Sequence, residues 1–140
     1  KDYVYMQWLM LQQEKAEDFV IATGKMITVK KFIELCSLKL GWNRGLEGKE
    51  GIIWEGTGIN EIGKRSDTGE IVIRIDPRYF RPTEVEELLG DCSKAKKKLG
   101  WEPKISLNQL ISEMIEADLK EAKKEFLLKK EGFNITSPKE

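Results

Sequence analysis

Arg81 and Glu84 are the two side chains of this sequence whose types and spacing best suit ligand binding, and they flank Pro82-Thr83. Proline fixes its own φ near the helical value and disfavours helical backbone at the residue before it. The pattern therefore predicts a helix whose first turn contains Pro82 and Glu84, with Arg81 just outside. A guanidinium at that position matches phosphate oxygens, and the unpaired N–H groups of a helix N-terminus favour the same anion. The carboxylate only accepts hydrogen bonds and suits paired hydroxyls such as a ribose diol.

A structural interpretation of the same residues stays open at this point, in which Glu84 completes a helix cap and Arg81 forms a surface ion pair.

A second motif is weaker. The stretch Gly56-Thr57-Gly58-Ile59-Asn60-Glu61 resembles the first half of a dinucleotide fingerprint, but its sixth position is Glu61 and no suitable helix follows, so we expect a loop. The sequence contains no Tyr-x-x-x-Lys, Gly-x-Ser-x-Gly, P-loop or HExxH motif. No residue of this chain is therefore predicted to be catalytic or to bind a cofactor or metal.

The composition is that of a globular protein. Its 140 residues suit one domain better than two, and 40% of them are hydrophobic and 34% charged. Lys+Arg and Asp+Glu are equal at 24 each, so charge favours neither nucleic acid nor membrane as a partner. We find no signal peptide and no apolar run of ~18 residues. Cys36 and Cys92 follow no metal-binding spacing, and we expect free thiols in a cytoplasmic protein.

The first part of the chain has an α/β order of predicted elements. Residues Tyr3–Gln13 are apolar around most of the helical circumference, which predicts a helix buried on most sides. The apolar run Asp18–Thr23 ends at Gly24 and predicts a buried strand. Thr28 is a good N-cap for a helix that stops at Gly41. Helix, strand and helix in this order are typical of a parallel sheet with helices on its faces.

From Trp42 the sequence becomes rich in glycine. The runs Ile52–Glu55 and Ile71–Asp76 predict strands that flank a polar, glycine-rich loop. Caps and glycine stops then predict three helices: Thr83–Leu89 before Gly90, Asp91 or Ser93 to Leu99 before Gly100, and a long helix that is capped by Ser106 and ends at Gly132.

Four segments together resemble the C-terminal part of the GDP-mannose 4,6-dehydratase family, within the extended short-chain dehydrogenase/reductase superfamily. They are Asp2–Gly24, Trp54–Gly63, Asp76–Leu107 and Leu110–Lys124. The arginine-proline-x-acid element is shared more widely among nucleotide-sugar enzymes of the superfamily. Its combination with "DPRYF" and "DYVYMQW" makes the resemblance specific, and the resemblance covers nearly the whole chain.

The resemblance implies an NADP-dependent lyase that converts GDP-mannose to GDP-4-dehydro-6-deoxy-mannose and water, a step of GDP-fucose biosynthesis. A hydride leaves C4 of mannose, water is eliminated across C5 and C6, and the hydride returns at C6. The family's NADP site and catalytic residues lie in its N-terminal portion, and this chain starts at Lys1 in the middle of a pattern. We therefore expect a fragment that binds substrate but is inactive alone. The resemblance assigns Arg81 to the GDP diphosphate and Glu84 to the ribose, and leaves Asn60 and Glu61 as structural.

The implied fold is α/β and has two parts. Residues 1–41 would supply the last helix-strand-helix of a Rossmann-type parallel sheet, 42–132 the small mixed α/β substrate-binding domain, and 133–140 a flexible tail. The strand around Phe19–Ala22 would then lack sheet neighbours, so we expect the chain to form a homo-oligomer through that edge. Two alternatives stay open. One is a fragment of a related nucleotide-sugar reductase or epimerase that shares Arg81 and Glu84. The other is a free-standing nucleotide-binding or assembly module without catalysis.

Overall fold

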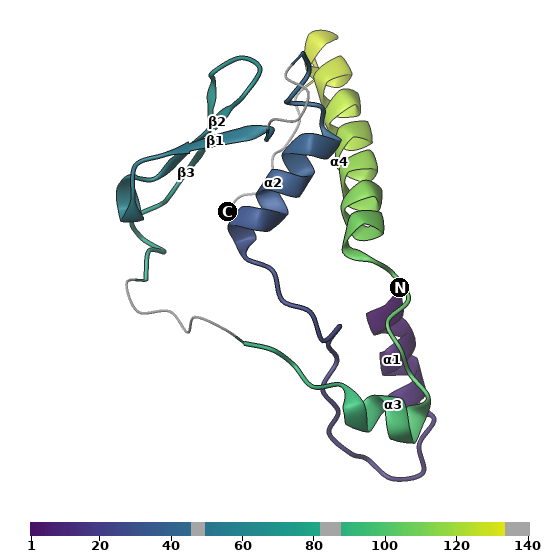
Figure 1. Cartoon of the computed structure of the whole chain (residues 1–140). Coiled ribbons are helices and arrows are strands. Elements are labelled where there is room, and N and C mark those ends of the chain that lie inside the picture. The colour runs from purple at the N-terminus through teal and green to yellow at the C-terminus, as the bar shows by residue number, and fades with distance from the viewer. Residues whose placement is uncertain (46–49, 82–87, 134–140) are drawn as a thin grey trace.

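A computed structural model gives the architecture of the chain and describes residues 1–45, 50–81 and 88–133. The elements in these ranges are α1 (Asp2–Leu11), α2 (Val29–Lys39), β1 (Ile52–Glu55), the 3-10 helix η1 (Gly58–Asn60), β2 (Ile62–Arg65), β3 (Ile71–Arg74), α3 (Ser93–Leu99) and α4 (Leu107–Lys130). The described part of the chain is therefore α/β. The sheet, α2 and most of α4 lie at one end of the molecule, and α1 and α3 lie at the other (Figure 1).

The sheet is antiparallel, with the strands in the order β1-β2-β3. Strands β1 and β3 confirm the two runs predicted from sequence, although β3 ends at Arg74. Strand β2 was missed because Ile62–Arg65 has one strongly apolar residue in four. Gly63 lies at its centre, where a Cβ would be 3.0 Å from Ile73 Cδ1 and 3.2 Å from Trp54 Cζ3. The glycine thus lets side chains of both neighbouring strands pack closely over β2.

A small core joins α1 to α3. Met6, Ala95 and Trp101 are fully buried, and Phe19 and Ile21 pack against them. The indole Nε1 of Trp101 donates a hydrogen bond of 3.0 Å to the backbone oxygen of Asp2. Burial of large apolar side chains stabilises by about 1.5–3 kcal/mol each, so this cluster is what holds the end of the molecule that contains α1 and α3 together.

The strand predicted over Asp18–Thr23 is wrong, because the described structure has no regular secondary structure there. A strand needs a hydrogen-bonded neighbour, and the described strands pair only among themselves. The apolar run packs instead through Phe19 and Ile21 into the α1–α3 core. No parallel sheet occurs within residues 1–45, 50–81 and 88–133.

Helix α1 was expected to be buried on most sides, and that expectation is also wrong. Met6 is its one fully buried residue, and the opposite face, with Val4, Trp8 and Leu11, is exposed. The helix packs along a single stripe because α3 and Trp101 reach only that side of it.

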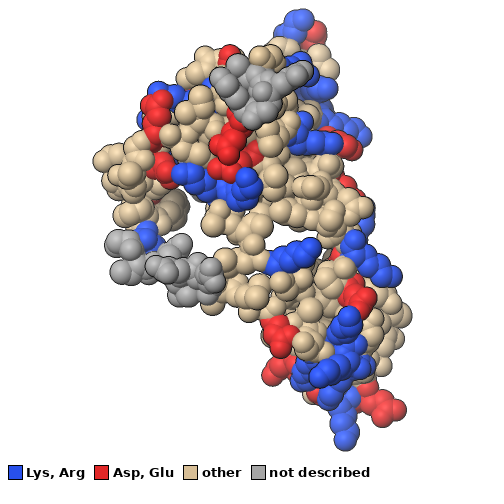
Figure 2. Space-filling model, in the orientation of Figure 1, with Lys and Arg blue, Asp and Glu red and all other residues tan. Residues whose placement is uncertain are grey.

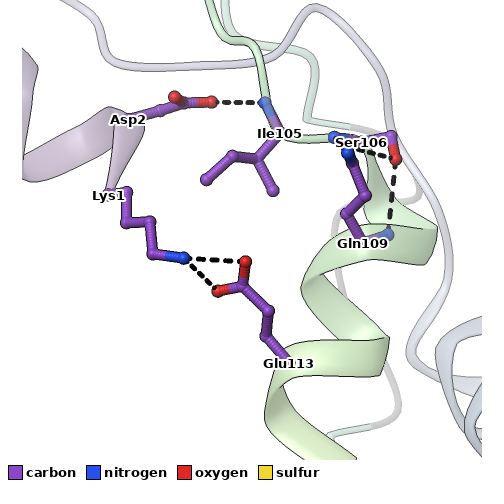
Figure 3. A network of polar contacts seen from close by, with 6 residues as sticks. All are labelled: Lys1, Asp2, Ile105, Ser106, Gln109 and Glu113. Carbon is purple, nitrogen blue, oxygen red and sulfur yellow. Dashed lines mark hydrogen bonds and ion pairs between the residues drawn. The ribbon is translucent and has the colours of Figure 1, made fainter.

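The helix ends predicted at Thr28, Ser106 and Gly100 are confirmed. Two others are wrong: the N-cap of α3 is Cys92 and neither Asp91 nor Ser93, and Leu88 and Leu89, which were expected to end a helix before Gly90, are not helical. The hydroxyl of Thr28 accepts a hydrogen bond from Lys31 N and begins α2. Ser106 forms a capping box with Gln109 and begins α4, as Figure 3 shows. Gly100 ends α3 with a φ of +63°, a conformation that glycine adopts without steric cost.

Helices α2 and α4 pack against each other, and α2 also contacts the start of β1. Ser37 is fully buried, and a Cβ on Gly51 would lie 2.4 Å from its Oγ. This close approach sets the position of α2 relative to the sheet.

Several sequence predictions fall on residues outside the described ranges. They include most of the helix expected over Thr83–Leu89 and the tail after Phe133.

Within the described ranges, Cys36 and Cys92 are free thiols, and burial raises the pKa of Cys36. No helix among these residues is long and apolar enough to cross a membrane. None of their acidic or cysteine side chains gather into a cluster that could hold a metal ion.

Candidate nucleotide-binding site

The segment that leads to Arg81 leaves β3 through a tight turn. Tyr79 N donates to the backbone oxygen of Asp76 at 3.1 Å, and Arg78 N donates to Asp76 Oδ1 at 2.9 Å. The Arg78 guanidinium also binds this carboxylate, with Nη2 2.6 Å from Oδ2. The ion pair lowers the pKa of Asp76 and raises that of Arg78. Arg78 is therefore engaged within the turn.

Arg81 lies two residues beyond this turn, and its side chain is exposed. It makes no hydrogen bond or ion pair with any other residue that the structure describes, which distinguishes it from Arg78. Glu84, its predicted partner, lies outside the described residues. The structure thus places the predicted arginine at the surface, while the convergence of Arg81 with Glu84 stays a prediction.

Two aromatic residues precede Arg81. Tyr79 is 75% exposed, and the Arg78 guanidinium lies 5.3 Å from the centroid of its ring. Phe80 is more covered, with 39% of its surface exposed. A Cβ on Gly58 would be 3.9 Å from Phe80 Cζ. The tip of the ring therefore lies near the turn between β1 and β2.

That turn is the stretch that resembles a dinucleotide fingerprint. Gly56 and Gly58 both have positive φ, +81° and +57°, and η1 is followed directly by β2. The prediction of a loop is confirmed. A dinucleotide cradle needs a helix whose N-terminal N–H groups face the pyrophosphate, and the antiparallel β1-η1-β2 hairpin does not provide one. This part of the chain does not fit NADP.

Near η1, four side chains link the hairpin to α2. Lys30 Nζ lies 2.6 Å from Glu61 Oε1 and 4.6 Å from the centroid of the Trp54 ring. Trp54 Nε1 in turn donates to Glu34 Oε1 at 3.2 Å. The contact between Lys30 and Glu61 could not be predicted from the sequence, because no sequence pattern pairs residues 31 positions apart, and Glu34 carries no motif either.

A separate cavity of about 570 Å³ lies at the start of α4. It is lined by Thr23, Lys25, Ile27, Leu110 and the stretch from Pro103 to Asn108. Arg81 does not line this cavity, so it is not the predicted nucleotide site. Figure 2 shows a second hollow, between the end that contains the sheet and the end that contains α1 and α3. In this view its rim is mostly uncharged, with Lys and Arg side chains above and below it (Figure 2).

Comparison with known proteins supplies the family. A family model described as GDP-mannose 4,6 dehydratase matches residues 1–114, which include Arg81. The chain belongs to the GDP-mannose 4,6-dehydratase family. The GDP-mannose 4,6-dehydratase of Yersinia enterocolitica is 49% identical over 138 residues, which cover 97% of this chain and 37% of the relative. That of Vibrio cholerae is 48% identical over 138 residues, 96% of this chain and 37% of the relative. The human protein is 45% identical over 119 residues, 85% of this chain and 30% of the relative.

The chain therefore spans about a third of the length of these dehydratases. The resemblance stated from "DYVYMQW" and "DPRYF" is confirmed at the level of the family. Both motifs, and the whole Arg81-Pro82-Thr83-Glu84 element, lie inside the matched region.

Proposed function

We propose that this chain is the substrate-binding part of a GDP-mannose 4,6-dehydratase, and that Arg81 and Glu84 hold the GDP moiety of GDP-mannose. The family match over residues 1–114 carries the proposal. It favours a dehydratase over the related reductase or epimerase and over a module without catalysis, because relatives named as dehydratases align with nearly the whole chain.

The surroundings of Arg81 support its role. Its guanidinium is exposed and has no partner among the described residues, whereas Arg78 is held by Asp76. An arginine of this kind can present two parallel N–H donors to a diphosphate. A carboxylate at Glu84 would accept hydrogen bonds from both ribose hydroxyls, which gives the two residues separate parts of the nucleotide.

NADP and the groups that move hydride and protons are proposed to lie outside this chain. NADP would supply the hydride acceptor and donor of the lyase reaction. Residues 1–41 would then belong to the Rossmann-type cofactor domain, 42–132 to the substrate domain, and 133–140 to a tail. The exposed apolar face of α1 supports the proposal that other polypeptide covers it, in a homo-oligomer or in a longer chain. We propose the cytoplasm as the location.

Calorimetric titration of GDP into the chain tests the role of Arg81. Loss of a charge-assisted contact to phosphate costs about 1.5–3 kcal/mol, so Arg81→Ala should weaken GDP binding about tenfold or more. Guanosine, which has no phosphate, should bind both proteins equally. Arg78→Ala is the matched control, since its guanidinium is engaged by Asp76, and it should leave the affinity for GDP within about twofold.

Glu84→Gln gives the complementary measurement. It should weaken guanosine and GDP alike and should have a smaller effect on 2′-deoxyguanosine, which lacks one hydroxyl of the diol. Equal GDP affinity of the unsubstituted chain and Arg81→Ala would refute the assignment of Arg81 to the diphosphate. Equal loss of GDP and guanosine on Arg81→Ala would show a general disruption of the site.

A further inference from the structure

We infer that the ion pair between Lys30 and Glu61 positions Arg81 for the diphosphate, by holding η1 under the ring of Phe80. The inference rests on the proposed function of Arg81. It gives a role to Glu61, which the resemblance left as structural, and to Lys30.

The anchor of this arrangement is α2. Lys30 lies in its first turn, behind the N-cap Thr28, and its Nζ is 2.6 Å from Glu61 Oε1. The Trp54 ring limits the position of the same ammonium, which lies 4.6 Å from the ring centroid. The indole Nε1 of Trp54 donates a hydrogen bond to Glu34, which is also on α2. Glu61 therefore meets a cation whose position is already restricted by a helix and an aromatic ring.

Glu61 transmits this position to η1. Its backbone N donates to Gly58 O at 3.1 Å, and Asn60 N donates to Thr57 O at 3.2 Å. These bonds close the turn at Glu61, whose side chain is held by Lys30. A Cβ on Gly58 would lie at ordinary contact distance, 3.9 Å, from Phe80 Cζ. The tip of the Phe80 ring thus lies next to this turn.

Phe80 is joined covalently to Arg81, so the turn next to its ring limits where the backbone that carries the guanidinium can lie. The turn at Asp76–Tyr79 restricts the same segment from the other side. With both restraints present, Arg81 meets the diphosphate with less loss of conformational freedom, and preorganisation of this kind raises affinity without a new contact.

The exposure of the pair argues against a purely stabilising role. The side chains of Lys30 and Glu61 are 43% and 26% exposed, and partly exposed ion pairs contribute little to folding stability. The positioning role therefore predicts an effect on GDP binding with little change in the unfolding midpoint.

A double-mutant cycle on the whole chain tests this inference, with GDP and guanosine as probes. Glu61→Gln and Lys30→Met should each weaken GDP binding at least about threefold and leave guanosine unchanged. Lys30→Arg keeps the cation and should retain most of the affinity. In the Arg81→Ala background, Glu61→Gln should have no further effect, since it acts through Arg81. The matched control is Glu55→Gln, which removes the Lys64–Glu55 pair, also 2.6 Å long and on the same hairpin.

Two results would overturn the inference while the proposed function stands. One is that Glu61→Gln binds GDP as tightly as the unsubstituted chain, although Arg81→Ala binds GDP weakly. The other is that Glu61→Gln lowers the GDP affinity by the same factor in the unsubstituted chain and in Arg81→Ala. If Arg81→Ala itself binds GDP as well as the unsubstituted chain, the proposed function fails first, so the two failures can be told apart. Circular dichroism and unfolding midpoints check that each variant is folded.

Discussion

Removal of the Asp2 carboxylate should destabilise the junction between α1 and α4. One oxygen of Asp2, Oδ2, accepts hydrogen bonds of 2.7 Å from both Lys104 N and Ile105 N, just before the cap of α4; Figure 3 shows the bond to Ile105. The backbone oxygen of the same residue accepts from Trp101. Asp2 thus ties the first turn of α1 to the segment that leads into α4.

The expected cost follows from the two bonds to the carboxylate. Hydrogen bonds to a charged group contribute about 1.5–3 kcal/mol each when buried, and less when water can replace them. Lys104 is exposed and Ile105 half-buried, so Asp2→Ala should lower the free energy of unfolding by about 2–3 kcal/mol. Asp2→Asn keeps one oxygen acceptor but no charge and should cost about half as much.

The same contacts predict a dependence on pH. Hydrogen bonds from the backbone of Ile105 and Lys104 hold the pKa of Asp2 below its ordinary value. A carboxylate whose pKa is lower in the folded state stabilises the protein above its unfolded-state pKa of about 3.9. This contribution is lost as the pH falls through the lower, folded-state pKa. The difference in stability between the unsubstituted chain and Asp2→Asn should therefore be constant from about pH 5 to 8 and shrink below about pH 4.

Urea unfolding followed by tryptophan fluorescence at several pH values measures both effects. Glu113→Gln is the control, because it removes the nearby pair with Lys1 (Figure 3), whose side chains are 53% and 73% exposed. It should cost less than about 0.5 kcal/mol. A loss of stability below about 0.5 kcal/mol in Asp2→Ala at pH 7, or a difference that grows in acid, would refute the reasoning.

Three further predictions concern stability and can be checked by the same urea titration. Gly51→Ala should cost about 1–3 kcal/mol, because its Cβ would lie 2.4 Å from the Oγ of the buried Ser37; a neutral effect would contradict the close approach of α2 and β1. Ser106→Ala should cost about 1 kcal/mol through loss of the capping box with Gln109, and Ser106→Asp, which keeps an acceptor, should restore most of it. Trp101→Ala should cost about 3–5 kcal/mol, since the side chain is 1% exposed at the centre of the α1–α3 core; a folded variant of unchanged stability would show that this cluster does not hold that end together.

The sequence singled out Arg81 through the motif around Pro82, and the structure shows that its side chain is exposed after β3 and a turn. The family match includes this residue, and its role at a nucleotide site stays a prediction. The partnership of Lys30 with Glu61 could not be read from the sequence. They are 31 residues apart, and neither helical nor strand periodicity links residues at that distance. The two side chains meet because the hairpin packs onto α2.

Local signals in the sequence determined where α2 and α4 begin and where α3 ends. Thr28, Ser106 and Gly100 act through hydrogen bonds and backbone angles of their own neighbours, so their effects are the same in any fold. Tertiary structure decided the rest. Residues Asp18–Thr23 have the composition of a strand but no strand beside them in the described chain, and β2 has a poor composition but two partners. A strand depends on hydrogen bonds to another segment, whereas a helix satisfies its own. For that reason the sequence indicated β1 and β3 but neither β2 nor the absence of a strand over Asp18–Thr23.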